Sequence, residues 1–465
     1  MAKKRNSGFG ALGRGMAVSL AGLRAGGALA LDGAVGRVLG REEGDSEFAR
    51  REARRFVAEL GRLKGTYVKI GQMMALFGEH FLPAVLVEAL RELSDGTEPM
   101  AWSELEPFVR ESLGARYDEL DIDPQAVAAA SLAQVHLARL RDGGEWICLK
   151  IQYPGLRELI EADFDAVIRM LVLSRWVKSG RDLDNWMHSL REHLLLEIDY
   201  RREARVTTQM RERVSTLRVD SVHYHVPELF PRYCSGEVLA MEFIEGYPVT
   251  AKEVSGLSQA RRDALGRAML ELFFYELYDW GLLQTDPNFG NYLLRLDDRR
   301  KSEADDELAL LDFGSVLDCP EDFLLHLRRT VAASQQQDMH AIVEGLTGLG
   351  CLQPDASAEG REMFADFCLH LLEPLRPADQ LPAEYLNAQG EYCWARSHLM
   401  RRAGKKAAAS AASRHFTPPS REFALIARKL TGVFNFIAAL DAQFNGCDVL
   451  ERHVAAWQER EIPAG

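Results

Sequence analysis

Residues 284–291 run Gln-Thr-Asp-Pro-Asn-Phe-Gly-Asn, and residues 311–314 run Leu-Asp-Phe-Gly. The first stretch places a carboxylate, Asp286, five positions before an amide, Asn291, and the second places another carboxylate, Asp312, after an apolar run. Carboxylate and amide oxygens are ligands that hold Mg²⁺ beside nucleotide phosphates. The two stretches are therefore candidates for a site that handles a metal ion and phosphates.

This spacing is that of the catalytic loop and the Asp-Phe-Gly segment of protein kinases. Gln284 stands where a histidine usually precedes the aspartate. A densely charged run, 295–307, lengthens the interval between the two stretches. We expect short β segments at 291–295 and 308–311 with the charged run between them, because a hairpin tip tolerates extra residues at a small entropic cost.

The composition is that of a folded protein with large apolar cores. Of 465 residues, 47% are hydrophobic and 27% are charged, which argues against disorder. The net charge of -13 disfavours nucleic acid as a partner. No uninterrupted apolar stretch reaches the roughly 18 residues of a transmembrane helix. The seven cysteines contain no Cys-x-x-Cys pair, which fits a reducing compartment and argues against disulfides or zinc.

The first 40 residues differ from the rest of the chain. They carry six basic residues and one acidic residue, a net charge of +5, among mostly Gly, Ala and Leu. Three interpretations stay open: a targeting signal, a mobile tail, or a segment that lies on an anionic membrane surface. We expect a cytoplasmic protein with peripheral contact to the inner membrane face and no transmembrane helix.

The hydrophobic pattern divides the chain into four parts. We expect a basic, Gly/Ala-rich segment at 1–45, a helical extension at 46–124, a small mixed α/β part at 125–245 and a large helical part at 246–465. This order suggests a two-lobed α+β enzyme with its site in the cleft.

Local patterns refine this division. Helices are predicted from Ser46, at 84–93 and at 103–114, where Ser103 and Glu106 have capping-box spacing. Alternating and β-branched runs predict strands at 135–140, 146–151, 224–226 and 238–243.

The predicted strand 146–151 carries a candidate nucleotide ligand. Alternation sends Ile147 and Leu149 to one face and Cys148 and Lys150 to the other. A small side chain leaves room for a base, and an ammonium two residues away can reach phosphates. Alone, this pattern is more often a half-exposed strand lysine.

A long helix is predicted at 188–207 and carries three acidic residues. Asp199 and Glu203 are four apart and share a face, while Glu197 lies roughly 120° around the helix from Glu203. Like charges on one face are unfavourable unless cations meet them, so Lys150 is expected to pair with Glu203. The alternative, a solvated acidic face, is less favoured because the neighbouring residues are apolar.

In order along the chain, these motifs resemble the UbiB/AarF family of atypical kinases, which is linked to coenzyme Q biosynthesis. Three features separate the set from ordinary protein kinases. They are Lys69-Ile70-Gly71-Gln72, which matches the family's Lys-x-Gly-Gln signature; Ala128–His136, which matches its Ala-rich loop; and Lys150–Gly155, which matches the segment around its strand lysine.

The remaining motifs extend the likeness. Glu197-Ile198-Asp199 matches the family's Glu-x-Asp. Gln284–Asn288 resembles the mitochondrial branch, with its Gln-Thr-Asp-Pro-Asn loop, more than the usual bacterial His-x-Asp form. The likeness runs from about Leu63 to Val316, with a weaker likeness at Pro418–Leu440.

The resemblance implies an α+β fold: a two-lobed protein-kinase-like fold with a helical N-terminal extension and a large helical C-lobe. It also assigns roles to residues. The implied catalytic residues are Asp286, Lys150, Glu203, Asn291 and Asp312. The implied ligands of ATP or ADP are Ala128, Ala129, Ala130, Ser131 and Lys150, with backbone groups near Glu242 and Ile244 at the adenine edge. Mg²⁺ is implied at Asn291 and Asp312, and regulatory roles at Lys69, Gln72, Glu197 and Asp199.

Two of these features change the expected chemistry. Alanines restrict φ and add methyl groups, so the Ala-rich loop should be stiffer than a glycine loop and grip phosphates differently. By the resemblance, Lys69 and Gln72 would fill the space that a protein substrate needs. Glu197 and Asp199 are then the expected partners of Lys69, which leaves Glu203 for Lys150, although Glu197 and Glu203 could exchange roles.

The resemblance thus implies an ATP-binding atypical kinase or ATPase that supports ubiquinone biosynthesis or membrane lipid homeostasis, through Mg²⁺-dependent ATP hydrolysis or small-molecule phosphorylation. The implied partners are the nucleotide, prenylated quinone precursors or lipids, and quinone-biosynthesis proteins. One alternative is a small-molecule kinase of the choline or aminoglycoside kind; the Lys-x-Gly-Gln motif and the Phe-Gly after Asp312 speak against it. Another is a nucleotide-gated, lipid-binding chaperone without phosphotransfer.

Overall fold

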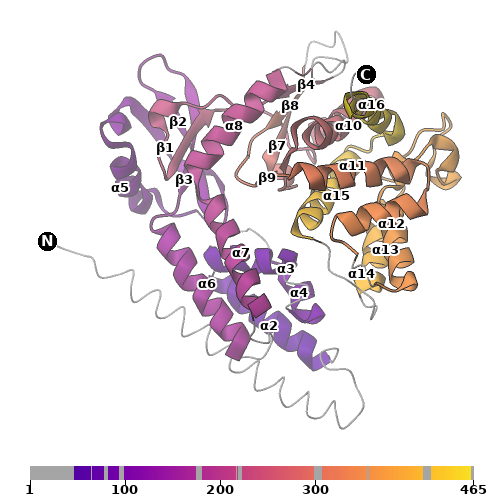
Figure 1. Cartoon of the computed structure of the whole chain (residues 1–465). Helices are drawn as coiled ribbons and strands as arrows, with labels where there is room; N and C mark the ends of the chain where they lie inside the picture. The colour runs from indigo at the N-terminus through magenta and orange to yellow at the C-terminus, as the bar shows by residue number, and fades with distance from the viewer. Residues whose placement is uncertain are drawn as a thin grey trace. The chain divides into compact units, whose positions relative to one another are not determined.

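In a computed structural model of the chain, two compact units are distinguished (Figure 1). The structure describes residues 47–63, 65–77, 82–93, 99–173, 181–215, 217, 222–297, 306–352, 356–411 and 420–461. The N-terminal unit comprises the described residues of Met1–Arg205 and Glu228–Phe243, and the C-terminal unit those of Val206–Pro227 and Ile244–Gly465. The basic segment predicted at 1–45 lies outside the described residues. None of the helices in the described ranges is both long enough and apolar enough to cross a bilayer.

Five helices of the N-terminal unit share one apolar core. They are α2 (Glu47–Leu63), α3 (Thr66–Phe77), α4 (Ala84–Leu90), α6 (Leu156–Leu173) and α7 (Arg181–Glu197). Helix α2 buries Phe56, Val57 and Leu60, whose spacing places them on one side of the helix. Gly71 lets α3 lie close to Leu93, because a Cβ there would come within 2.4 Å of Leu93 Cδ1. The helix predicted from Ser46 and the one predicted near 84–93 are confirmed.

An antiparallel sheet forms the rest of this unit, with strand order β1-β2-β3-β5. The strands are β1 (Leu120–Ala129), β2 (Ala133–Leu140), β3 (Trp146–Gln152) and β5 (Val238–Glu242). Helix α5 (Trp102–Leu113) contacts β5, and its Leu105 and Val109 share one apolar cluster with Ile147 and Leu149. The predicted alternation on β3 is confirmed, since both of these strand residues are fully buried while Lys150 is only partly so.

Two local predictions are wrong. The helix predicted at 188–207 is two helices, α7 and α8 (Tyr200–Ser215), separated at Ile198 and Asp199. Helix α5 begins at Trp102 with Ala101 as its N-cap and no side-chain cap. Ser103 therefore lies inside the first turn, and Glu106 accepts hydrogen bonds from Arg110 and Tyr117 instead of closing a capping box.

The C-terminal unit is mostly helical and is built around α10, which is buried on nearly all sides. Its helices are α9 (Lys252–Ser255), α10 (Gln259–Phe274), α11 (Glu321–Gln335), α12 (Met339–Gly348), α13 (Ala358–Leu371), α14 (Leu399–Ala411), α15 (Arg421–Ala439) and α16 (Gly446–Glu461). A π-helical turn over Tyr275–Trp280 continues α10. Helices α15 and α16 both pack on α10.

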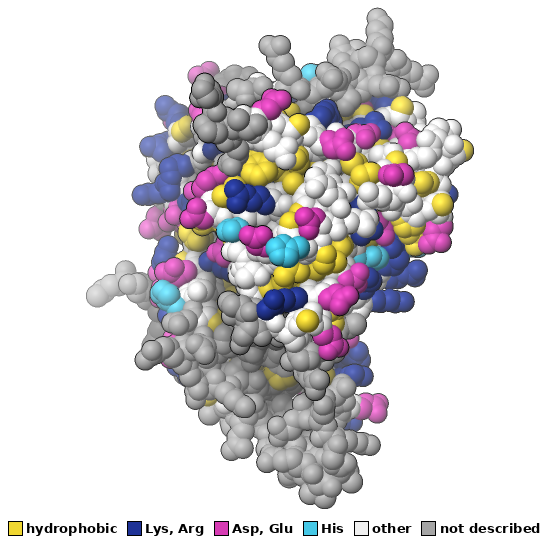
Figure 2. Space-filling model, turned by 45° about the vertical axis from the view of Figure 1, so that its right-hand side comes forward, with side chains coloured by type: hydrophobic (Ala, Val, Ile, Leu, Met, Phe, Trp, Pro, Cys, Tyr) yellow, Lys and Arg dark blue, Asp and Glu magenta, His cyan; other side chains and the backbone are white. Residues whose placement is uncertain are grey.

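Two small sheets complete this unit. One has the order β4-β8-β7, and the other pairs β6 with β9. The strands are β4 (Val222–His225), β6 (Leu282–Gln284), β7 (Tyr292–Arg295), β8 (Asp306–Leu310) and β9 (Val316–Asp318). The predicted strands at 291–295 and 308–311 are confirmed as the β7–β8 pair. The pairing of β4 parallel to β8 and the β6–β9 pair were not predicted. On the face shown in Figure 2, basic and acidic side chains are interspersed with apolar ones.

Candidate active site

The β7–β8 hairpin brings two of the predicted metal ligands to neighbouring positions. Its register pairs Tyr292 with Leu310, and the Leu311 N–H donates to the Asn291 carbonyl at 2.9 Å. Asn291 therefore lies opposite Leu311, one residue before Asp312. Part of the charged run, 298–305, falls between the two strands and outside the described residues.

The loop that carries Asp286 is fastened to the segment after Asp312. Strand β6 pairs with β9, which sets Gln284 opposite Val316. The Thr285 N–H donates to the Ser315 carbonyl at 2.8 Å, and the two hydroxyl groups lie 2.9 Å apart. Thr285 is almost fully buried, so its contacts with Ser315 anchor the Asp286 loop in the protein interior.

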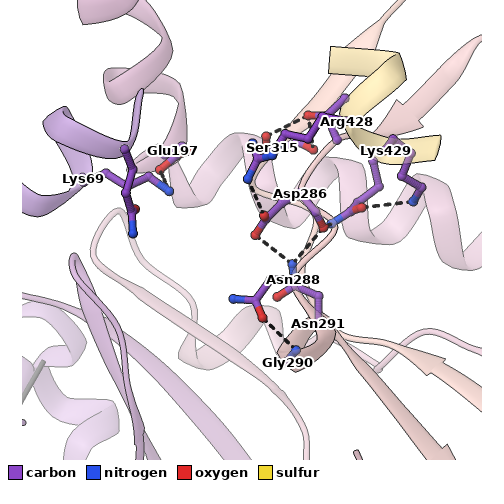
Figure 3. Close-up of polar contacts among 12 residues, drawn as sticks. Lys69, Glu197, Asp286, Asn288, Gly290, Asn291, Ser315, Arg428 and Lys429 are labelled. Carbon is purple, nitrogen blue, oxygen red and sulfur yellow. Dashed lines mark hydrogen bonds and ion pairs between the residues drawn. The ribbon is translucent and has the colours of Figure 1, made fainter. Parts of the chain in front are cut away.

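Both oxygens of the Asp286 carboxylate are engaged (Figure 3). Asn291 Nδ2 donates to Oδ2 at 2.9 Å, and an Arg428 guanidinium nitrogen donates to Oδ1 at 3.1 Å. A carboxylate attracts the amide NH₂ and repels the amide oxygen, so this contact turns the Asn291 Oδ1 away from Asp286. That orientation suits a cation ligand. Nearby, Asp312 Oδ1 accepts from the Gly314 N–H at 2.8 Å.

Gln284 connects this loop to a buried ion pair. Its Nε2 donates to the Asp286 carbonyl at 2.8 Å, and its Oε1 accepts from Lys429 Nζ and from the Tyr292 hydroxyl, both at 3.1 Å. Lys429 lies 3.2 Å from a Glu276 carboxylate oxygen, and each side chain is 1% exposed. Burial raises the pKa of Glu276 to about 7, although the Lys429 charge opposes that rise.

In the N-terminal unit, the structure pairs each cation with the carboxylate expected for it. Lys150 Nζ on β3 lies 2.6 Å from Glu203 on α8, whose side chain is 2% exposed. Lys69 Nζ on α3 lies 2.7 Å from Glu197 at the end of α7 (Figure 3). Lys150 also lies 5.3 Å from the centre of the Tyr200 ring, which adds a cation–π contact.

Asp199 has a different position from the one predicted. It lies between the two helices, and its Oδ1 accepts from the Arg202 N–H at 2.9 Å, as an N-cap of α8 does. The argument that Asp199 and Glu203 share a helix face is therefore wrong. The cap instead fixes the first turn of α8, which carries Glu203.

The Lys69 helix is held by polar contacts that the motif alone does not reveal. The Thr66 hydroxyl donates to the carboxylate of Asp163 on α6, and both side chains are buried. Gln72 Nε2 donates to the Leu93 carbonyl at 3.4 Å, just after α4. These contacts fix α3 within the helical core. They thereby fix the backbone position from which the Lys69 side chain extends.

The Ala-rich stretch is part strand and part turn. Ala128 and Ala129 end β1, and the turn runs from Ala130 through Ser131, with the Ala130 N–H donating to the Ala133 carbonyl at 2.8 Å. Gly65, at φ +59°, faces this turn: a Cβ there would lie 3.7 Å from the Ser131 carbonyl oxygen.

The strand that leaves the turn carries a buried polar pair. Gln134 and His136 are both 0% exposed. Gln134 exchanges hydrogen bonds with the Met100 backbone, and its Nε2 lies 2.7 Å from His136 Nε2. His136 Nδ1 lies 2.8 Å from the Asp123 carbonyl. Because this contact needs an N–H on Nδ1, His136 is held as the neutral Nδ1 tautomer, and burial lowers its pKa.

At the predicted adenine edge, one donor is already used. The Glu242 N–H donates to the Glu228 carbonyl at 2.8 Å, so it is not available to a base. Cys148, on the same β3 face as Lys150, packs beside Tyr200 and Met241. Burial raises the pKa of the Cys148 thiol to about 11, so it is neutral at pH 7.

Sequence reasoning missed the residues of α15 that reach the Asp286 loop. A signal exists for one of them: Lys429 occupies an apolar position of an amphipathic helix, with Leu425, Ile426 and Val433 on the same side. Arg428 has no such signal, because an arginine on a helix is ordinarily solvated.

Comparison with known proteins agrees with this geometry. A family model described as the ABC1 atypical kinase-like domain matches residues 92–346. The chain is 30% identical to the mitochondrial atypical kinase COQ8 of Saccharomyces cerevisiae over 326 residues, which are 69% of this chain and 62% of the yeast protein. The alignment thus spans less than two thirds of that relative. The chain is 28% identical to the mitochondrial atypical kinase COQ8B of Rattus norvegicus over 431 residues, 91% of this chain and 77% of the rat protein.

A solved structure shows the same fold. Rv3197 from Mycobacterium tuberculosis, in complex with erythromycin, superposes with a TM-score of 0.59 at 24% identity, covering 87% of this chain and 96% of that one. The family match covers more than half of the chain, and the resemblance drawn from the motifs is confirmed. The chain belongs to the ABC1 atypical kinase-like family, the UbiB/AarF atypical kinases, and has their two-lobed α+β fold.

Proposed function

We propose that this chain binds ATP with Mg²⁺ and either hydrolyses it or transfers its terminal phosphoryl group to a small molecule. One observation carries the proposal: the hairpin register places Asn291 beside Asp312, while the Asn291 amide is bonded to Asp286. Three oxygen-bearing side chains of the kind that handles phosphates thus share one end of the hairpin.

The residues fit the group that the proposal requires. Asn291 and Asp312 would hold Mg²⁺, because the amide oxygen is turned away from Asp286 and a carboxylate oxygen is a hard ligand. When bound, the ion neutralises charge on the phosphates. Asp286 would accept a hydrogen bond from the attacking hydroxyl or water and orient it.

The N-terminal unit would contribute Lys150 and the Ala-rich turn. A lysine held by a nearly buried glutamate keeps its charge and a fixed reach, which suits a phosphate ligand. Ala128, Ala129, Ala130 and Ser131 would lie along the phosphates. The backbone of Ile244 and the carbonyl of Glu242 would bind the adenine edge.

Lys69, Gln72, Glu197 and Asp199 would restrain the reaction. The Lys69–Glu197 pair is mostly buried, with side-chain exposures of 23% and 14%, so it is a defined contact and not a loose surface pair. Lys69 would place a fixed charge where a protein substrate would otherwise enter. This favours ATP hydrolysis or a small acceptor over protein phosphorylation.

The names of the relatives support a role in ubiquinone biosynthesis, because the yeast and rat proteins are COQ8 kinases. We propose prenylated quinone precursors or lipids as partners, with peripheral membrane contact through residues 1–45. The Gln-Thr-Asp-Pro-Asn loop is our reason for favouring the mitochondrial branch as the nearest.

A thermal-shift measurement with ATP, with and without Mg²⁺, tests the proposal. Asp312→Asn should lose the Mg²⁺-dependent part of the ATP shift. Asp318→Asn, an exposed aspartate at the end of β9, is the matched control and should keep it. A full Mg²⁺-dependent shift in Asp312→Asn would contradict the assignment.

A further inference from the structure

Helix α15 packs closely against the loop that carries Asp286. Gly432 faces Pro287 so closely that a Cβ on it would lie 1.9 Å from Pro287 Cβ. Lys429, on the same helix, donates a hydrogen bond to Gln284, which in turn donates to the Asp286 carbonyl. Arg428 is one helical turn before Gly432 and therefore points to the same loop.

The Arg428–Asp286 contact is too exposed to matter much for stability. The two side chains are 38% and 30% exposed, and ion pairs at such exposed sites contribute little to stability. Its geometry is more informative than its strength. Asn291 holds one oxygen of the Asp286 carboxylate and Arg428 holds the other, so the plane of the carboxylate is fixed only when both are present.

We propose that Arg428 is a positioning residue for Asp286, so that α15 is a working part of the phosphoryl-transfer site. This rests on the function proposed above. The family model matches only residues 92–346, so the inference extends the site beyond the matched segment. The guanidinium fixes the rotation of the Asp286 carboxylate and offsets its charge where an anionic phosphate approaches. Without it, the Asn291 bond is the one side-chain contact that the described residues still give the Asp286 carboxylate, which can then turn.

The expected signature is a loss in turnover with nucleotide binding retained, because the nucleotide ligands proposed above are other residues. In the full-length protein, Arg428→Ala should lower kcat for Mg²⁺-dependent ATP hydrolysis by about 10- to 100-fold, the scale of a misplaced catalytic group. ATP affinity should stay within about twofold, and Arg428→Lys should retain part of the activity. Added guanidinium at millimolar, non-denaturing concentration should restore turnover to Arg428→Ala.

Two variants separate positioning from structural support. Gly432→Ala should push α15 off Pro287 and lower turnover, but guanidinium should not restore it. Arg421→Ala, at the exposed start of α15, should match wild type with and without guanidinium.

Unchanged kcat in Arg428→Ala would overturn the proposal. So would a loss that guanidinium does not restore, or one matched by an equal loss of ATP affinity. If wild type shows no hydrolysis that depends on Asp312, the proposed function itself fails, and this inference falls with it.

Discussion

Replacing Lys429 with methionine should destabilise the protein by an amount that depends on pH. The Lys429 ammonium and the Glu276 carboxylate are each 1% exposed, so methionine fills the space but leaves Glu276 without its cation. Breaking a buried pair by removing one partner typically costs about 3–5 kcal/mol. Glu276 can limit this cost by taking up a proton, since a neutral carboxyl needs no counter-charge.

The magnitude follows from that protonation. The ordinary pKa of a glutamate is 4.5, and that of Glu276 in wild type is about 7, so wild type already carries most of the protonation cost at pH 7, about 3 kcal/mol. Above pH 7 wild type releases the proton, whereas the variant must keep it at a further cost of about 1.4 kcal/mol per pH unit. Gln284 and Tyr292 also lose a donor, which adds roughly 1 kcal/mol. We therefore expect a loss of about 1.5 kcal/mol at pH 7 and of about 3.5 kcal/mol at pH 9.

The sign of the pH dependence follows from the direction of the pKa shift. A carboxyl whose folded-state pKa is raised binds its proton more tightly in the folded protein, so stability is lost as pH rises from 4.5 towards the folded-state pKa. In Lys429→Met that pKa is higher still than in wild type. The penalty relative to wild type should thus stay small up to pH 7, where both proteins lose stability together, and should grow between pH 7 and pH 9, where only wild type can release the proton.

Urea unfolding at pH 7 and pH 9 measures both values. The double variant Lys429→Met/Glu276→Gln should recover much of the loss and show no such dependence on pH, because glutamine does not titrate. Lys405→Met, an exposed lysine on α14, is the matched control and should change stability by less than about 0.5 kcal/mol. A penalty that is equal at both pH values, or below about 2 kcal/mol at pH 9, would refute the reasoning.

Four further predictions concern the other elements. Ala130→Gly should change the ratio of ATP to ADP affinity, because it frees φ in the turn; an unchanged ratio in titration calorimetry would show that the turn does not touch the phosphates. Lys69→Ala should gain autophosphorylation from labelled ATP, and Lys69→Ala/Asp312→Asn should lack it; equal labelling of wild type and Lys69→Ala would mean that Lys69 does not restrain the site. Burial lowers the pKa of His136, so the unfolded chain binds its proton more readily and stability should fall as pH drops below about 6.5; a His136→Gln variant that showed the same fall would exclude this group as the cause. Deleting residues 1–40 should weaken co-sedimentation with anionic vesicles at low salt, at about 1 kcal/mol per basic residue near the surface, whereas no change would make the segment a tail.

Sequence patterns sufficed where one residue's neighbours decide its environment. Alternation on β3 predicted that Ile147 and Lys150 lie on opposite faces, because strand geometry alone sets those directions, and the structure buries the Ile147 face. The two short β segments predicted on either side of the charged run are the strands of the β7–β8 hairpin, because a charged run between two apolar segments is typical of an exposed connection.

Prediction failed where two local structures compete or where contacts are distant in sequence. The apolar pattern runs through Ile198 without a glycine or proline. The helix nevertheless ends there, because Asp199 is the N-cap of a new helix. Strands β6 and β9 have three residues each, too few for a period to be recognised. Arg428 lies 142 residues from Asp286, so no local pattern could link them.

The contacts of α15 bear on what the family segment can do alone. Within residues 92–346, Glu276, Gln284 and Pro287 face partners that lie beyond residue 346, namely Lys429 and Gly432. Without α15, the buried Glu276 carboxylate would lose its cation. Gln284 would lose the Lys429 hydrogen bond that helps to orient its amide toward the Asp286 carbonyl. The Asp286 loop is therefore supported by a helix far along the chain, so part of its packing and of its hydrogen bonding lies outside the matched segment.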